Sequence, residues 1–176
     1  MFKRILVPTD GSQLAEEAAN GAVVLAQSVG ASIVGFYAMP TYDETAYETV
    51  VISPGWIPEE EFHKLHDRAA KKYLGAIEKI AKAAGVRCES YTRSTARPAV
   101  AIVEAAREKR CDLICMGSHG RGGLEQIFLG SVATKVLSMC DIPVLVHRGK
   151  ARKSRTKPTT SSKAGHKADS AAGPAR

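Results

Sequence analysis

Cysteine is scarce in this sequence of 176 residues, and its few cysteines lack the spacing of a metal knuckle. Four cysteines are too few and too scattered for a scaffold held by disulfides. Cys111 and Cys115 are separated by three residues, not by the two of a zinc or redox motif. His63 and His66 lie three apart, but on an acidic helical turn where solvation is the simpler role. We expect reduced, buried cysteines and no metal site.

The sequence also lacks a recognisable membrane or export segment. Residues 8–10 end the N-terminal apolar stretch before it reaches the length of a signal peptide. Residues 18–42 carry no charge and exceed the ~20 residues needed to span a bilayer. Asn20, Gln27 and Ser32 interrupt that stretch, so it favours a helix, a turn and a strand. We expect a cytoplasmic protein with no membrane span.

Familiar catalytic motifs are missing. The chain contains no P-loop lysine motif, no Gly-x-Ser-x-Gly elbow and no evident Ser/His/Asp constellation. We therefore predict no catalytic residue.

Positive charge is concentrated at the C-terminal end. Nine basic residues and one acid give residues 148–176 a net charge of +8, so residues 1–147 carry −1 of the chain's +7. The net positive charge of the chain therefore comes from the tail, and it does not indicate a nucleic-acid-binding fold. We predict a domain at 1–147 and a disordered basic tail at 148–176, because the tail has no apolar residue larger than alanine. The tail could contact a polyanion or remain solvated without a specific partner.

Short apolar runs alternate with stretches of helical periodicity throughout residues 3–147. The expected strands are 3–8, 33–39, 86–93, 112–116 and 142–147, and the expected helices are 14–29, 58–84, one beginning at Pro98, and 131–139. This alternation predicts an α/β fold: a single doubly wound domain with a five-stranded parallel sheet flanked by helices.

Two predicted strand ends carry residues that a hydrophobic core does not need. Ligands of parallel α/β sheets bind outside the carboxyl ends of the strands. Asp10-Gly11-Ser12 follows the first strand. The Asp10 carboxylate could accept hydrogen bonds from ribose hydroxyls or cap the next helix, and we favour the ligand role.

The second of these strand ends leads into a glycine-rich loop. Glycines at 117, 120, 122 and 123 would let the backbone approach an oxyanion closely. Gly130-Ser131 then offers the free amides of a helix N-terminus, which suit a phosphate chain. The alternative is a surface turn with Ser131 as an ordinary N-cap. His119 and Arg121 could contact phosphate or be solvated.

The spacing of Gly117, Gly120 and Gly130-Ser131, with two and nine intervening residues, resembles the nucleotide-binding signature of the universal stress proteins, in their ATP-binding branch. Residues 5–12 and 141–146 are similar to the two ends of that family. The resemblance therefore covers about residues 1–147.

The sequence departs from the family pattern at two places. Ala96 stands where family members often carry a glycine two residues before the proline, and the connection from 40 to 58 is longer. The first departure concerns only the backbone geometry of that loop.

The resemblance implies a Rossmann-like nucleotide-binding fold that binds ATP, with Mg²⁺ as a candidate accompanying ion. It places Asp10 at the ribose, backbone near Ala38 and Met39 at the adenine, and Met116 beside the base or sugar. The residues expected at the phosphates are Gly117, Gly120, Gly130, Ser131 and Val132, with Arg121 as a further candidate. The expected function is a regulatory or stress-response protein whose nucleotide occupancy acts as a signal, with slow or no hydrolysis.

Two other function classes remain open. One is a weak ATP-using enzyme, although adenylating relatives carry a Ser-Gly-Gly-x-Asp-Ser type of loop where this chain has Thr9-Asp-Gly-Ser12. The other is a protein that associates with nucleic acid or another polyanion through its basic tail.

A homodimer through the fifth strand is also expected. Pro143 is tolerated chiefly at a sheet edge, yet the neighbouring apolar run is unsuited to exposure. Pairing of two such edges would cover both, and the resemblance implies the same antiparallel contact. The alternative is an edge covered by the chain's own tail.

Overall fold

The computed structural model of this chain describes residues 1–42, 58–120 and 129–149. Within these ranges, five strands alternate with four helices. Their bounds are β1 Arg4–Pro8, α1 Gln13–Val29, β2 Ser32–Met39, α3 Glu59–Ala83, β3 Cys88–Ser94, α4 Pro98–Glu108, β4 Leu113–Gly117, α5 Ser131–Met139 and β5 Val144–His147.

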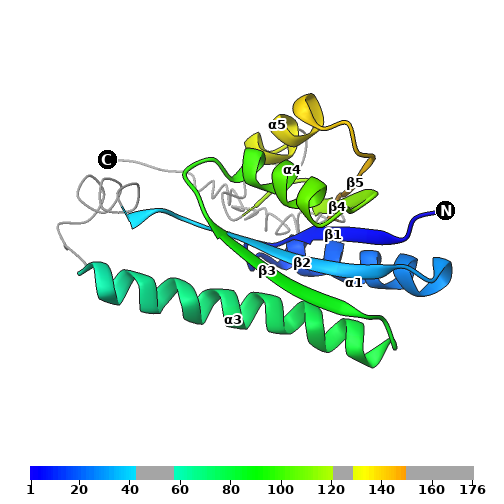
Figure 1. The fold of residues 1–176 in the computed structure, drawn as a ribbon, viewed down its shortest axis with the longest axis horizontal. Helices are drawn as coiled ribbons and strands as arrows, with labels where there is room; N and C mark the ends of the chain where they lie inside the picture. Colours follow the sequence, from blue (N-terminus) through cyan, green and yellow to red (C-terminus); the bar gives the residue numbers. More distant parts are fainter. Residues whose placement is uncertain (43–57, 121–128, 150–176) are drawn as a thin grey trace, which may run out of the picture.

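The five strands form one parallel sheet in the order β3-β2-β1-β4-β5 (Figure 1). Ile5 of β1 lies opposite Ile33 of β2 on one side and opposite Leu113 of β4 on the other. The strand order therefore reverses between β1 and β4, which is where ligands of such sheets bind. The predicted doubly wound parallel sheet is confirmed.

Helices cover both faces of the sheet, α1 and α3 on one and α4 and α5 on the other (Figure 1). The core layer beneath α1 and α3 includes Ile5, Val7 and Cys115 from the strands. The opposite layer includes Leu6 and Ile114. Because successive strand residues point to opposite faces, the adjacent Ile5 and Leu6 are both fully buried, each in a different layer.

Residues at the helix ends explain where the helices begin and end. Ser12 caps α1, since its side chain accepts a hydrogen bond from the Ala15 amide at 3.2 Å. Gly30 ends that helix with a φ of +71°, a conformation that glycine adopts at little cost. Pro98 occupies the first turn of α4, where its missing N–H is tolerated. The predicted end at Gly30 and start at Pro98 are confirmed.

Strand β5 lies at the sheet edge, as predicted, but it is shorter than the expected 142–147. Pro143 precedes the strand, and its carbonyl accepts a hydrogen bond from the Ile114 amide at 3.0 Å. Proline cannot donate to a ladder, so regular pairing begins only at Val144.

Several expectations concern residues outside the described ranges. These are Arg121, most of the 40–58 connection and the tail from residue 150. Within the described ranges, no helix is both long and apolar enough to cross a membrane. The uncharged stretch from residue 18 forms the rest of α1, a turn and β2, as expected.

The cysteines and two histidines differ in part from expectation. All four cysteines are free thiols, but only Cys111 and Cys115 are buried, and burial raises the pKa of each thiol to about 11. His63 is exposed as expected, whereas His66 packs its ring on Phe62 with 4.3 Å between centroids. The described residues contain no group of three or more potential metal-binding side chains.

Candidate functional site

A cavity of about 940 Å³ lies at the carboxyl ends of β1, β2 and β4. Its walls are largely apolar and include Phe36, Ile102 and Met116. Asp10, Tyr37 and His119 are its titratable lining residues within the described part of the chain. A large, mostly apolar cavity with a few converging polar groups is typical of a small-molecule site.

The cavity brings together the described site residues that the sequence predicted, with one exception. Those that line it are Asp10, Ala38, Met116, Gly117, Gly120, Gly130, Ser131 and Val132. Met39 does not line it, because its side chain packs on the α3 side with Tyr37 and Leu74. Its carbonyl accepts a hydrogen bond from the Thr95 amide at 2.8 Å.

Asp10 faces the start of the glycine loop. A Cβ built on Gly120 would lie 2.6 Å from Asp10 Oδ2, so any other residue there would force the carboxylate to shift. The other carboxylate oxygen, Oδ1, accepts a hydrogen bond from the Ser12 amide at 3.0 Å. The alternative role of Asp10 as the helix cap is wrong, because the Ser12 side chain caps α1.

Gly11 fixes the turn that carries Asp10. Its φ is +78°, and a Cβ at this position would lie 2.1 Å from Cε1 of the Tyr73 ring of α3. Tyr73 in turn packs edge-on against Tyr37, with 5.5 Å between ring centroids. Helix α3 therefore supports the Asp10 turn from the side of the sheet opposite α4 and α5.

Replacement of Gly11 by alanine should destabilise the protein by about 3 kcal/mol or more, since it combines a left-handed backbone with overpacking. Gly30→Ala is a matched control, because Gly30 has a φ of +71° and nothing within 4 Å of its added Cβ. It should cost only about 1 kcal/mol. Chemical denaturation measures both, and adding Tyr73→Ala should bring the cost of Gly11→Ala close to that of the control. Equal costs for the two single variants would refute the packing argument.

The N-terminus of α5 opens into the cavity. Gly130 is its N-cap and no side chain caps the helix, so the alternative of Ser131 as an ordinary N-cap is wrong. The first helical hydrogen bond runs from the Thr134 amide to the Gly130 carbonyl at 2.9 Å. The amides of residues 131–133 therefore have no backbone partner in the described part of the chain, and all three residues line the cavity. Such amides favour an anionic group.

Ser118 and His119 connect this helix to the sheet. The Ser118 amide donates to the His147 carbonyl at 2.8 Å, and its carbonyl accepts from the Gly130 amide at 2.7 Å. The Ser118 hydroxyl lies 3.0 Å from His119 Nδ1. The other ring nitrogen, Nε2, is buried and has no hydrogen-bond partner among the described residues. Burying a ring nitrogen without a hydrogen-bond partner costs free energy. A ligand atom that hydrogen-bonds to Nε2 would remove this penalty.

The end of β2 presents free backbone groups to the cavity at Ala38. In a parallel sheet, alternate residues hydrogen-bond to opposite neighbours. The Phe36 carbonyl accepts from the Thr9 amide on the β1 side, and the Met39 carbonyl accepts from the β3 side. Ala38 therefore directs its N–H and C=O toward the β1 side, where β1 has already ended at Pro8. Neither group has a partner within the described ranges.

Much of the apolar lining was missed by sequence reasoning. Phe36, Ile102 and Ala133 are buried residues at core positions of a strand and two helices. Their sequence pattern is the one that any core residue shows, so no signal in the sequence marked them as cavity lining.

Comparison with known proteins places the chain among the universal stress proteins. The model of the universal stress protein family matches residues 1–148. A universal stress protein of Methanocaldococcus jannaschii is 35% identical over 146 residues, which cover 83% of this chain and 82% of the relative. One from Thermus aquaticus is 37% identical over 152 residues, which cover 84% of this chain and 100% of the relative.

Solved structures share this fold. Protein MJ0577 of Methanocaldococcus jannaschii matches with a TM-score of 0.73 and 27% identity, over 86% of this chain and 99% of that one. A universal stress protein in complex with cAMP matches with a TM-score of 0.62 and 26% identity, over 84% of this chain and 99% of that one.

Proposed function

The chain belongs to the universal stress protein family, and from this we propose that it binds ATP in the cavity and uses nucleotide occupancy as a regulatory or stress-response signal. The observation that carries the proposal is the pairing of two sets of free backbone groups in one cavity. Ala38 offers an N–H and a C=O, and the first turn of α5 offers amides. The cAMP complex of a structural neighbour supports an adenine nucleotide.

The free groups of Ala38 match the edge of adenine. The C=O would accept a hydrogen bond from the adenine amino group, and the N–H would donate to ring nitrogen N1. A guanine or hypoxanthine ring presents an oxygen and an N–H at these positions, so both contacts would become unfavourable. The apolar walls formed by Phe36, Ile102 and Met116 would pack against the base.

The phosphates would lie between the glycine loop and α5. Gly117, Gly120 and Gly130 leave room for close approach, and the orphan amides of α5 would donate to phosphate oxygens. The Asp10 carboxylate would accept hydrogen bonds from the ribose hydroxyls.

Mg²⁺ would reach this site on the nucleotide. Asp10, the single carboxylate among the described lining residues, is assigned to the ribose, so phosphate oxygens and water would hold the ion. We propose that hydrolysis of the bound nucleotide is slow or absent.

A titration with three nucleotides tests the adenine assignment. ATP should bind with one site per chain, whereas GTP and ITP should bind at least about 100-fold more weakly, since two backbone groups would lose their partners. ITP is the sharper comparison, because it carries the same ribose and triphosphate as ATP and has hypoxanthine in place of adenine. Calorimetry that gives equal affinities for ATP and ITP would contradict recognition by Ala38.

The protein also forms a homodimer through β5 in this proposal. The carbonyls of Pro143 and His147 accept hydrogen bonds from the amides of Ile114 in β4 and of Ser118 just after it. Because alternate residues of a strand face opposite neighbours, the N–H and C=O groups of Val144 and Val146 point to the free edge of the sheet. Leu145 of the same strand remains 46% exposed. An antiparallel β5 from a second copy would satisfy the edge groups.

A further inference from the structure

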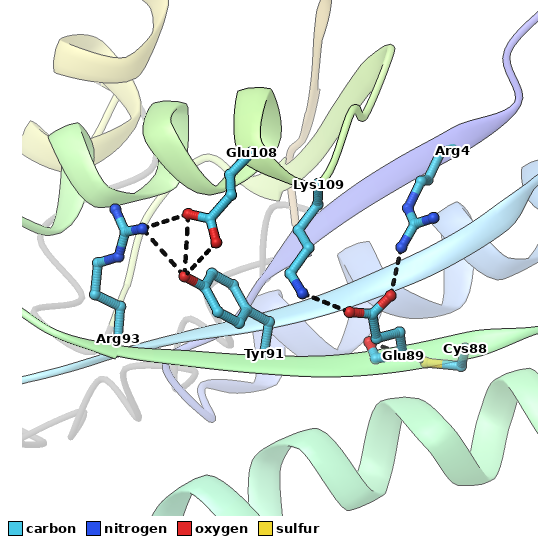
Figure 2. A network of polar contacts seen from close by, with 7 residues as sticks. All are labelled: Arg4, Cys88, Glu89, Tyr91, Arg93, Glu108 and Lys109. Atoms are coloured by element: carbon cyan, nitrogen blue, oxygen red, sulfur yellow. Dashed lines mark hydrogen bonds and ion pairs between the residues drawn. The ribbon is translucent and has the colours of Figure 1, made fainter.

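His119 carries an unpaired polar atom at the cavity. The residue lines the cavity, and its ring nitrogen Nε2 is buried without a hydrogen-bond partner among the described residues. The described part of the chain holds one other such side-chain atom, Arg4 Nε. Figure 2 shows that the Arg4 guanidinium points to Glu89, which Lys109 also contacts, so Arg4 already belongs to an ion-paired network. His119 instead lines a ligand-sized cavity, where a bound molecule can supply the missing partner.

The His119 ring lies beside the first turn of α5. A Cβ built on Gly130 would lie 3.3 Å from His119 Cα and 3.9 Å from Cδ2, the ring carbon bonded to Nε2. Gly130 is the N-cap of α5, and its own amide donates to the Ser118 carbonyl at 2.7 Å. The amides of residues 131–133 follow it and have no backbone partner among the described residues. The unpaired nitrogen and these amides are therefore neighbours at one end of the cavity.

Ser118 determines which nitrogen of this ring carries the proton. The Ser118 hydroxyl lies 3.0 Å from His119 Nδ1, and Ser118 is only 2% exposed. Within the described ranges this hydroxyl has no other hydrogen-bond partner. Because Nδ1 is the acceptor offered to it there, the hydroxyl donates to Nδ1, and the neutral ring then carries its proton on Nε2. Nε2 is therefore a hydrogen-bond donor, as the amides of α5 are.

A donor in this position fits a phosphate oxygen. Phosphate oxygens are acceptors, and several N–H groups that converge on them form a typical oxyanion site. In this tautomer Nε2 cannot be a metal ligand, since a ligating nitrogen must be unprotonated. For the same reason it cannot act as a base that takes a proton from water. The chemistry left to Nε2 is the binding of an anionic oxygen.

We propose that His119 Nε2–H donates a hydrogen bond to a phosphate oxygen of the bound nucleotide, and that this contact makes the site favour adenosine phosphates over adenosine. The role of His119 rests on the proposed function, because it needs an adenine nucleotide in the cavity. Ala38 and the apolar walls would contact only the base, so they would bind adenosine and ATP alike. The α5 amides and His119 distinguish the two ligands, and of these groups only the imidazole can be removed by a side-chain substitution.

Three single-residue variants of the full chain separate the N–H donor from the bulk of the ring. His119→Leu removes both nitrogens and keeps an apolar side chain. His119→Gln keeps an amide N–H donor at a similar distance from the backbone. His63→Leu is the matched control, because His63 is an exposed histidine of α3 that does not line the cavity. Thermal melting verifies that each variant is folded.

Calorimetry measures the affinities for ATP and adenosine at about pH 8, where a histidine is ordinarily neutral. His119→Leu should bind ATP at least about tenfold more weakly and adenosine less than about threefold more weakly, because only ATP loses a charge-assisted hydrogen bond. For ATP, His119→Gln and His63→Leu should stay within about threefold of the wild type. Unchanged ATP affinity in folded His119→Leu, equal losses for ATP and adenosine, or equal losses for the Leu and Gln variants would each overturn the contact.

Nitrogen-15 NMR of the wild-type ring gives an independent readout, since it reports which nitrogen carries the proton. The spectrum should show a protonated Nε2 and an unprotonated Nδ1, and ATP but not adenosine should move the Nε2–H proton downfield. A proton on Nδ1 would overturn the tautomer and the contact with it. A wild-type chain that does not bind ATP would overturn the proposed function itself, whereas ATP binding without these His119 effects would overturn the role of His119 alone.

Discussion

Substitution of Gly130 by valine is expected to weaken ATP binding at least about 100-fold while the protein stays folded. The φ of Gly130 is −63°, a value that valine also adopts, so the backbone itself is not strained. A Cβ would nevertheless lie 3.1 Å from the Ser118 carbonyl oxygen and 3.3 Å from His119 Cα. Gly130 lines the cavity at the start of α5, so the added methyl groups would crowd the space assigned to the phosphates.

Gly75→Val is the matched control for this experiment. Gly75 lies in α3 away from the cavity, and nothing lies within 4 Å of its added Cβ. Calorimetry should give nearly wild-type ATP affinity for this variant, and circular dichroism should report folded protein for both. Asp10→Asn provides a second test that adds no volume, and it should weaken ATP about tenfold through the ribose contacts. Unchanged ATP affinity in folded Gly130→Val would show that the phosphates bind elsewhere.

Leu145→Lys is expected to convert the dimer to a monomer at micromolar concentration. Leu145 is exposed in the single chain, so the substitution costs the monomer little. A β5-to-β5 interface would have to bury the lysine and its charge, which should weaken association at least about tenfold. Light scattering should report twice the 18.8-kDa chain mass for wild type and the single mass for the variant.

Leu65→Lys is the matched control for the dimer, because Leu65 is 53% exposed on α3, which packs on β2 and β3 at the end of the sheet away from β5. It should leave the dimer intact. A monomeric wild-type protein would refute the interface, and a Leu145→Lys variant that stays dimeric would assign the contact to another surface.

Most of the fold could be predicted from the sequence because local signals and the global arrangement agree. Gly30 and Pro98 delimit helices by their own backbone preferences, and the helix signals between strands leave few options besides a parallel sheet. The boundary of β5 could not be predicted, because the apolar run begins at Ile142 whereas pairing begins after the proline. The burial expected of Cys88 was also wrong, since Cys88 is only partly buried and no residue of edge strand β3 is fully buried.

The candidate site was predictable where its residues differ from core residues. Asp10 and the loop glycines are polar or conformationally special at strand ends, so their positions could be recognised. The sequence could not show that Ala38, and not Met39, lines the cavity. The direction of a residue's backbone N–H and C=O groups depends on the strands paired on either side and not on residue type. The support of the turn by Tyr73 depends on how α3 packs, which periodicity alone does not give.

A crystal structure of the full chain with ATP tests the central claim most directly. The account predicts electron density for one nucleotide per chain in the cavity, with the adenine edge on the Ala38 backbone. The phosphates should lie within hydrogen-bond distance of the amides of residues 131–133, and the ribose should lie beside Asp10. Density for ATP outside the cavity, or with the triphosphate at Ala38 and the base at α5, would contradict it.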